Sequence, residues 1–266
     1  MATTNLGAAL SANVFSGAFG DATFTAAREE TTADGAYGNS ATQNPDSSHL
    51  VVGTYAADIF GTNNRSHFMG FYMLDFDLSS ISTTITGLTL KLKGKSVTAI
   101  SDVATGTSTM YDADAIILKS QHQDTPDLTD INNFTGHQAG YDADDVTEFS
   151  SAFGPAAGTW NIGSYNEILL NLDAVSDANT QKAAGNRFKM CAINKSRTYD
   201  NDDTNLGDST GAYNRDYYYL NFEADTENSD PPILVITHED AAGVALPTFS
   251  LKGGNLSLNG GTLTIK

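Results

Sequence analysis

The feature that most restricts the fold is an alternation of apolar and polar residues with period two along residues 68–94, FMGFYMLDFDLSSISTTITGLTLKLKG. Tyr72, Leu74 and Phe76 fall on one face of an extended chain, and further along three leucines alternate with Thr and Lys over 88–93. A period of two is typical of β-strands, and the second pattern indicates one face in a core and one in water. We therefore expect two strands, joined by a Ser- and Thr-rich turn that the Asp77 carboxylate shapes.

Similar short runs recur and predict an all-β protein. Further strands are expected at 49–52, 115–119, 167–172, 187–193, 216–222 and 233–238. An Asp followed by helical spacing predicts short inserted helices at 127–134 and 142–153, and a third helix at 173–184 is expected to end at Gly185. Together these segments make about eight strands, which is enough for two packed sheets.

Composition argues against several functional classes. The formal net charge is -18, which disfavours a nucleic-acid partner because phosphate binding depends on Lys and Arg. No apolar stretch is long enough to cross a bilayer, and the N-terminal residues lack a basic segment followed by an unbroken apolar run. We therefore expect that the protein is synthesised in the cytoplasm and does not insert into a membrane. Cys191 is the only cysteine, and we expect a small buried hydrophobe there.

No catalytic constellation emerges from the sequence. The five histidines show neither HExxH nor HxH spacing, and no Ser lies in a GxSxG motif. Two carboxylates could support glycoside hydrolysis, but among 32 acidic residues some suitable pair is inevitable. We therefore expect a non-enzymatic protein without a bound cofactor, structural calcium excepted.

Two local patterns are candidate binding sites. Asp200, Asp202 and Asp203 lie in an acidic loop that could hold calcium, although the loop lacks EF-hand spacing and a solvated acidic loop is the alternative. Tyr217 and Tyr219 alternate with apolar neighbours on an expected strand. They are candidates for stacking on a glycan, for a protein interface, or for packing across the sheet.

The two ends of the chain differ from the body at 31–238. Residues 1–30 are small and polar with scattered aromatics, which predicts an N-terminal arm or, as the alternative, an edge strand. Residues 239–266 read as a linker followed by three short apolar runs separated by Gly-Gly turns, which predicts a small β meander. The apolar positions expected to share one face and support oligomerisation are Phe249, Leu251, Leu256, Leu258, Leu263 and Ile265.

Several stretches taken together resemble the DNRLRE-type domain over about residues 32–238. They are TADGAYGN, HLVVG, FYMLDFDLSSI with TITGLTLKLKG, SYNEILLNLDAVSDANTQKAAGNRFKM and DPPILVITH. The resemblance implies a jelly-roll β-sandwich, related in shape to carbohydrate-binding modules, of a kind that recurs in bacterial surface proteins and bacteriophage virion proteins. Asp75 stands where that family commonly has a basic residue.

The resemblance, the acidic composition and the two appendages lead to one functional expectation and one alternative. We expect a structural protein on the outer surface of a bacteriophage particle, as a head decoration, a fibre or a tail-associated protein. It would attach through a terminal appendage to other virion proteins and form a homo-oligomer, for which a trimer is one option. The alternative is a glycan-binding module for receptor recognition or adhesion, with a cell-surface glycan as its partner.

Overall fold

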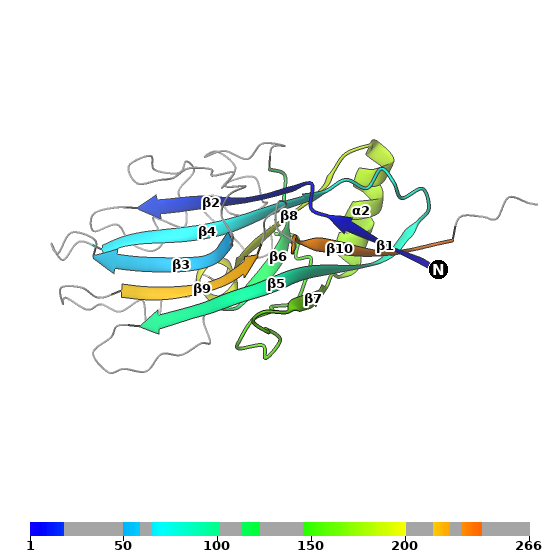
Figure 1. Cartoon of the computed structure of the whole chain (residues 1–266). Helices are drawn as coiled ribbons and strands as arrows, with labels where there is room; N and C mark the ends of the chain where they lie inside the picture. The colour runs from blue at the N-terminus through cyan, green and yellow to red at the C-terminus, as the bar shows by residue number, and fades with distance from the viewer. Residues whose placement is uncertain are drawn as a thin grey trace, which may run out of the picture.

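The computed structural model describes residues 1–18, 50–58, 65–101, 113–122, 146–200, 215–223 and 230–240. These residues form an all-β fold with one α-helix (Figure 1), so the all-β part of the predicted fold class is confirmed. The strands are β1 (Ala2–Gly7), β2 (Leu10–Ala18), β3 (Leu50–Asp58), β4 (Arg65–Phe76), β5 (Ile85–Ser101), β6 (Ala115–Lys119), β7 (Tyr165–Leu169), β8 (Phe188–Asn194), β9 (Arg215–Glu223) and β10 (Ile233–His238). Helix α2 covers Leu172–Ala184, and a π-helical turn, η4, covers Lys195–Tyr199.

The long strands β4 and β5 each change neighbours part of the way along one edge. There β4 pairs with β3 over 65–70 and with β8 over 72–76, while β2 pairs along its other edge. In the same way β5 pairs with β10 over 85–91 and with β9 over 93–101, while β7 pairs along its other edge. All pairings are antiparallel. They produce the row β2-β4-β3-β9-β5, seen side by side in Figure 1, and two four-stranded groups, β1-β10-β5-β7 and β2-β4-β8-β6.

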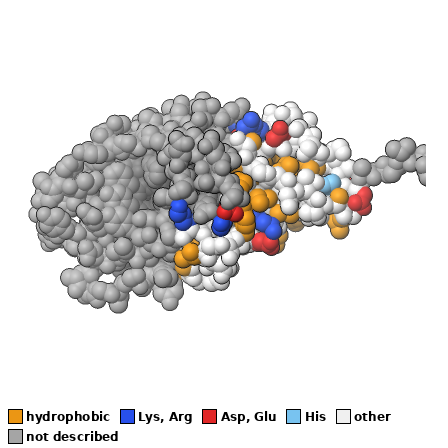
Figure 2. Space-filling view, in the orientation of Figure 1, with side chains coloured by type: hydrophobic (Ala, Val, Ile, Leu, Met, Phe, Trp, Pro, Cys, Tyr) orange, Lys and Arg blue, Asp and Glu red, His pale blue; other side chains and the backbone are white. Residues whose placement is uncertain are grey.

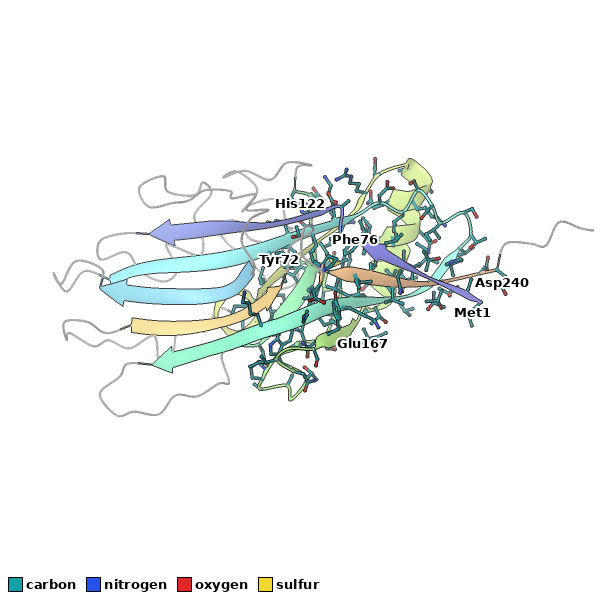
Figure 3. All side chains as sticks on the ribbon, viewed as in Figure 1. Met1, Tyr72, Phe76, His122, Glu167 and Asp240 are labelled. Atoms are coloured by element: carbon teal, nitrogen blue, oxygen red, sulfur yellow. The ribbon has the colours of Figure 1, made fainter. Side chains whose placement is uncertain are left out.

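The hydrophobic core brings the two four-stranded groups together in a sandwich-like arrangement. Tyr72, Phe76 and Phe188 from β4 and β8 are fully buried, and Tyr72 and Phe76 lie in the interior in Figure 3. The leucines of β5 that alternate with Thr and Lys belong to the same core cluster, as do Leu234 and Ile236 of β10. The prediction that one face of β5 lies in the core and the other in water is confirmed, because its leucines are buried and the residues between them are not.

Helix α2 forms where it was predicted and ends at Gly185. The Asn171 side chain caps its start by accepting a hydrogen bond from the Ala174 N–H at 3.0 Å. Gly185 ends the helix with φ 73°, a left-handed conformation that glycine adopts without a Cβ penalty. Asn179 joins the helix to β5, since it accepts from the Ile85 N–H at 3.0 Å and donates to the Ile85 carbonyl at 2.9 Å.

The helix predicted over 142–153 is wrong in its described part, residues 146–153. This segment is extended and pairs with the edge of β6 through single bridges. The Phe149 and Phe153 side chains are buried, and their N–H groups donate to the Ile117 and Ala115 carbonyls at 2.8 Å. Tertiary pairing therefore outweighs the local helical pattern. The helix predicted at 127–134 lies outside the described residues.

The first residues of the chain form strands of the sheet. Residues 2–7 pair with β10 and residues 10–18 pair with β4, so the edge-strand alternative describes this part of the predicted 1–30 arm. Residues 19–30 lie outside the description. So do residues 241–266 of the linker and meander predicted at 239–266, with the six apolar residues Phe249, Leu251, Leu256, Leu258, Leu263 and Ile265. The proposed division of the chain at 30 and 238 therefore stays a prediction.

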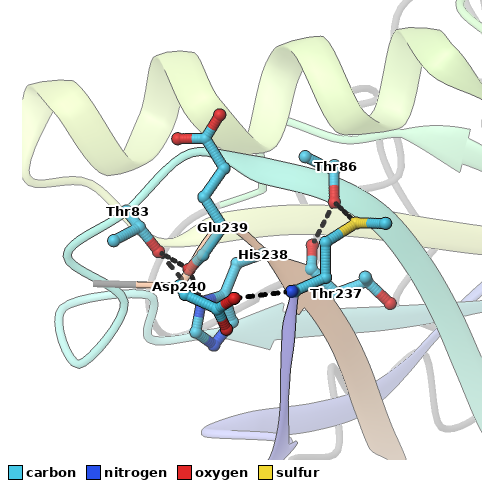
Figure 4. Close-up of polar contacts among 7 residues, drawn as sticks. Thr83, Thr86, Thr237, His238, Glu239 and Asp240 are labelled. Carbon is cyan, nitrogen blue, oxygen red and sulfur yellow. Dashed lines mark hydrogen bonds and ion pairs between the residues drawn. The ribbon is translucent and has the colours of Figure 1, made fainter. Parts of the chain in front are cut away.

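Polar contacts at the end of β10 hold β1 and the turn before β5 together (Figure 4). The α-amino group of Met1 lies 2.7 Å from the Asp240 carboxylate. The His238 ring lies between two hydroxyls, with Nε2 3.1 Å from Thr4 Oγ1 and Nδ1 2.9 Å from Thr83 Oγ1. Nδ1 also lies 2.8 Å from the Glu239 carbonyl, which can only accept, so this contact places the proton on Nδ1.

Candidate binding sites

A polar pocket of about 530 Å³ opens where β6, β8 and the C-terminal end of α2 meet. Its lining comes from two segments that are distant in sequence, 119–121 and 177–189, and that are brought together by β6–β8 pairing. The lining residues are Lys119, Ser120, Gln121, Asp177, Gln181, Gly185, Asn186, Arg187 and Lys189. None of these nine residues is aromatic, so the pocket is suited to hydrogen bonds and charge contacts.

Helix α2 contributes a chain of hydrogen bonds to the pocket. Asn186 Nδ2 donates to Gln181 Oε1 at 3.2 Å, and Gln181 Nε2 donates to Asp177 Oδ1 at 3.2 Å. The same Asp177 oxygen accepts from Lys119 Nζ at 2.6 Å, which ties the helix to β6. These contacts fix the direction of both amide groups, because each amide nitrogen must face an acceptor.

The strands contribute the remaining cations. Arg187 Nη1 donates to both carboxylate oxygens of Asp75, at 3.2 and 3.0 Å, and the Asp75 side chain on β4 is fully buried. Lys189 Nζ donates to the His122 carbonyl at 2.6 Å. The His122 ring is buried, with Nδ1 2.8 Å from Ser120 Oγ, and Figure 3 labels its position. Each cation at the pocket is thus held in place by a defined acceptor.

The solvent-facing side of the group β1-β10-β5-β7, which we call the outer face, is a second candidate. Strand register places Asn5, Val235, Thr89 and Leu169 in one row across the four strands. With the rows on either side, the outer face comprises Thr3, Asn5, Gly7, Gly87, Thr89, Lys91, Glu167, Leu169, Ile233, Val235 and Thr237. The charged residues among them are Lys91 and Glu167, whose side chains pair with each other. Leu169 is 75% exposed.

Charges on the outer face and at its border are matched in pairs. Lys91 Nζ lies 2.6 Å from Glu167 on the neighbouring strand, and Lys93 contacts Asp230. On the face seen in Figure 2, hydrophobic and uncharged side chains gather over the described part of the surface, with acidic and basic side chains beside each other. The outer face and its border are therefore close to electrically neutral, in a chain whose formal net charge is -18.

Other acidic residues have structural roles. Asp77 Oδ1 accepts from the Ser79 N–H at 2.9 Å, so the predicted turn-shaping role is confirmed. This backbone hydrogen bond holds the pKa of Asp77 below its usual 3.8. The carboxylate of Asp114 accepts from the Ala156 and Ala157 N–H groups at 2.8 and 2.9 Å. These acids order loops between strands.

The structure describes only part of the sites predicted from sequence. Asp200 is described and its carboxylate contacts Lys195, whereas Asp202 and Asp203 lie outside the described residues. Within the described part of the chain, no group of three or more His, Cys, Asp or Glu residues could hold a metal ion. Tyr217 and Tyr219 lie on β9 between β3 and β5, but the positions of their side chains are not described.

The prediction for Cys191 is confirmed, because the side chain is buried on β8. Burial disfavours the thiolate and raises the pKa of Cys191. The described residues contain no helix that is long and apolar enough to span a membrane.

Sequence reasoning missed both the pocket and the outer face. The alternation of Thr and Lys in β5 predicted a solvent-facing side for that strand, but nothing local indicated that β1 and β7 would extend it.

Comparisons with protein-family models and with curated proteins find no match for this chain.

Proposed function

We propose that the protein is a non-enzymatic structural protein on the outer surface of a bacteriophage particle, with a jelly-roll body and a terminal appendage for attachment. The observation that carries the proposal is the neutral outer face on a chain with a formal net charge of -18. Contact surfaces between proteins are depleted in charged residues at their centre. The choice of a phage particle rests on the resemblance to DNRLRE-type domains, which also suggests the jelly-roll topology.

The size of the outer face indicates how it would be used. Four strands with two or three residues each on one side make a surface roughly 15–20 Å on each edge, or about 300–400 Å². A standard stable interface needs about 800 Å² from each partner. The outer face alone would therefore support a weak contact, which becomes effective when many copies bind to a repeating surface or when an appendage adds a second contact.

Localisation tests the proposal. Particles released by a culture that encodes the chain are purified, analysed by mass spectrometry and labelled with an antibody against the full chain. We expect the chain in the particles and label on intact particles. Absence of the chain, or label that appears only after the particles are disrupted, would contradict a surface protein.

Two variants then test the outer face. Leu169→Glu with Val235→Glu adds two charges to the face and is expected to reduce incorporation into particles. The control variant, Ser80→Glu with Ser176→Glu, adds the same charge at two exposed positions outside the outer face. Equal incorporation of both variants would exclude the outer face as the attachment surface.

A glycan-binding module is the second candidate, and the polar pocket favours it. Its amide, hydroxyl and charged side chains are the groups that recognise sugar hydroxyls. A glycan array probed with the full chain tests this candidate directly, and binding to a defined set of saccharides is the expected result. Failure to bind across a broad array would count against it without affecting the structural proposal.

A further inference from the structure

We propose that the far edge of β7, the edge turned away from β5, binds the C-terminal segment of the same chain, with residues 250–252 added to it as an antiparallel strand. The binding site lies between β7 and residues 151–153, in the described part of the chain. Its occupant comes from residues 241–266, which lie outside that part. The inference goes beyond the proposed function, because it depends neither on where the protein is located nor on what the outer face contacts.

The first observation is the direction of the backbone groups of β7. The Leu170 N–H donates to the Leu88 carbonyl at 3.1 Å. Because hydrogen-bonded pairs alternate along an antiparallel ladder, Glu167 and Leu169 direct their N–H groups away from β5. In the described part of the chain, no hydrogen bond reaches these two N–H groups or the Glu167 carbonyl. An added strand would pair with these three groups.

The second observation is a pocket of about 280 Å³ along the far edge of β7, which we call the edge pocket. Ser150 forms a single bridge with Leu170 at the end of β7, whereas Phe153 pairs with Ala115 of β6. The edge pocket opens where the two backbones diverge, and its lining includes Phe153, Ile168 and Leu170. It is therefore suited to an apolar side chain carried on an extended segment.

The first apolar run of the predicted meander fits this edge in one register. With Leu251 placed opposite Ile168, the Leu251 side chain points into the edge pocket. Ser250 then lies on the outer face, opposite Leu169. The hydrogen-bonded pairs of this register fall at Leu169 and Glu167, the residues whose N–H groups are directed outward.

Charge also favours this segment as the occupant. Lys252 and Lys266 are the charged side chains of residues 241–266, whereas the whole chain has a formal net charge of -18. Attraction to an acidic body therefore favours docking of the segment. In the register given above, Lys252 lies opposite Glu167, whose side chain is 64% exposed and 2.6 Å from Lys91 Nζ. A carboxylate can accept from both ammonium groups, so the existing ion pair is retained.

The length of the connecting segment allows this docking within one chain. Strands β10 and β7 lie on opposite sides of β5, and both run toward its first residues. The path from Asp240 to the position opposite Leu169 covers about six residues along the sheet and about three strand spacings across it, which is about 25 Å. Residues 241–249 span about 30 Å when extended. The connection also gives the segment a high effective concentration, which favours its own β7 over that of a second copy.

Disulfide formation between two introduced cysteines tests the inference on the full chain. Leu169→Cys and Ser250→Cys face each other in the proposed register, with their Cα atoms about 5.5 Å apart, which suits a disulfide. The native Cys191 is buried and does not compete. On addition of oxidised glutathione we expect a disulfide within single chains.

The control pair combines Ser250→Cys with Ser176→Cys, an exposed position on α2. Its disulfide should form at a rate roughly tenfold lower, because docking on β7 lowers the local concentration of the tail elsewhere. Equal rates for the two pairs, no disulfide in the first pair, or disulfides that join two chains would overturn docking of the segment on its own β7.

A substitution in the tail tests the register without changing the body of the protein. Leu251→Asp places a charge at the edge pocket and should lower the rate of disulfide formation in the first pair roughly tenfold or more. The matched control Ser257→Asp adds the same charge at a tail position outside 250–252 and should leave the rate unchanged. An unchanged rate in Leu251→Asp, or an equal loss in both variants, would overturn the register.

Amide hydrogen exchange gives a reading that needs no introduced cysteine. The Glu167 and Leu169 N–H groups should exchange slowly in the wild-type chain, because the added strand accepts a hydrogen bond from each, and faster in Leu251→Asp. The Ile168 N–H faces β5 and should be protected in both proteins. Fast exchange at Glu167 and Leu169 in the wild-type chain would overturn the inference.

Discussion

The ion pair between Asp75 and Arg187 offers a quantitative test of how β4 accommodates a charge. The Asp75 side chain is fully buried, whereas that of Arg187 is 41% exposed, and Nη1 lies 3.2 and 3.0 Å from the two carboxylate oxygens. A buried carboxylate is costly unless a partner compensates its charge. Replacing Arg187 by Met keeps much of the apolar stem and removes the compensating charge.

The expected cost follows from the exposure of the two groups. Loss of one partner from a fully buried pair costs about 3–5 kcal/mol. Because Arg187 is partly exposed, water already screens the pair, and we expect about 2–3 kcal/mol for Arg187→Met. Adding Asp75→Asn removes the uncompensated charge. The double variant should therefore be more stable than the sum of the two single effects predicts, by about 2 kcal/mol.

Urea unfolding of the four proteins measures this coupling. Trp160 is the only tryptophan in the chain, and its ring centroid lies 6.0 Å from that of Phe153, so its fluorescence reports on packing in the described core. Far-UV circular dichroism on the same samples checks that the two transitions coincide. A coupling energy below about 0.5 kcal/mol would show that burial of the Asp75 carboxylate does not require the Arg187 charge, which would refute this prediction.

Three further predictions concern single positions. A Cβ at Gly94 would overlap the Asn161 carbonyl oxygen, so Gly94→Ala should lower the free energy of unfolding by about 1–3 kcal/mol. In the control Gly87→Ala the added Cβ meets only the Thr237 side chain, at 3.6 and 3.8 Å, and the free energy of unfolding should change little. The lowered pKa of Asp77 adds stability that is present above its unfolded value of 3.8 and lost as pH falls through the folded value. Replacing Asp77 by Asn should therefore cost more stability at about pH 6 than at about pH 2. The Cys191 thiol should react with a thiol reagent in urea but not in the native state, and rapid native labelling would contradict its burial.

Elements with a strong local pattern could be predicted from sequence. The apolar run at 115–119 and the β10 strand at 233–238 have the predicted bounds. Helix α2 lies within one residue of its prediction, because Gly185 is a local signal for its end. The leucine alternation at 88–93 correctly indicated which side of β5 is buried.

Elements that depend on pairing with distant residues could not be predicted. The segment ATTNLG has little apolar alternation, yet all six residues pair with β10, more than 200 residues away in sequence. Residues 146–153 carry a helical pattern, but the burial of Phe149 and Phe153 against β6 makes them extended. In both cases the partner strand, rather than the segment itself, determines the conformation.

The candidate sites are still less local. Lys119 and Asp177 are 58 positions apart, and Asp75 and Arg187 are 112 apart. No spacing rule joins such residues before the strand order is known. The outer face likewise takes one residue of its central row from each of four strands, Asn5, Val235, Thr89 and Leu169. Composition indicated only that the surface is acidic. It did not indicate which part of the surface lacks an excess of acidic residues.

Salt tests the outer face because the cations on and beside it are matched by acids. Lys91 Nζ lies 2.6 Å from Glu167, and Lys93 contacts Asp230. A contact made through this surface should therefore depend little on ionic strength. Attachment to particles that persists in high salt would agree with the outer face as the contact surface. Attachment that disappears as salt rises would instead require a contact between unmatched charges, and the outer face would lose its role.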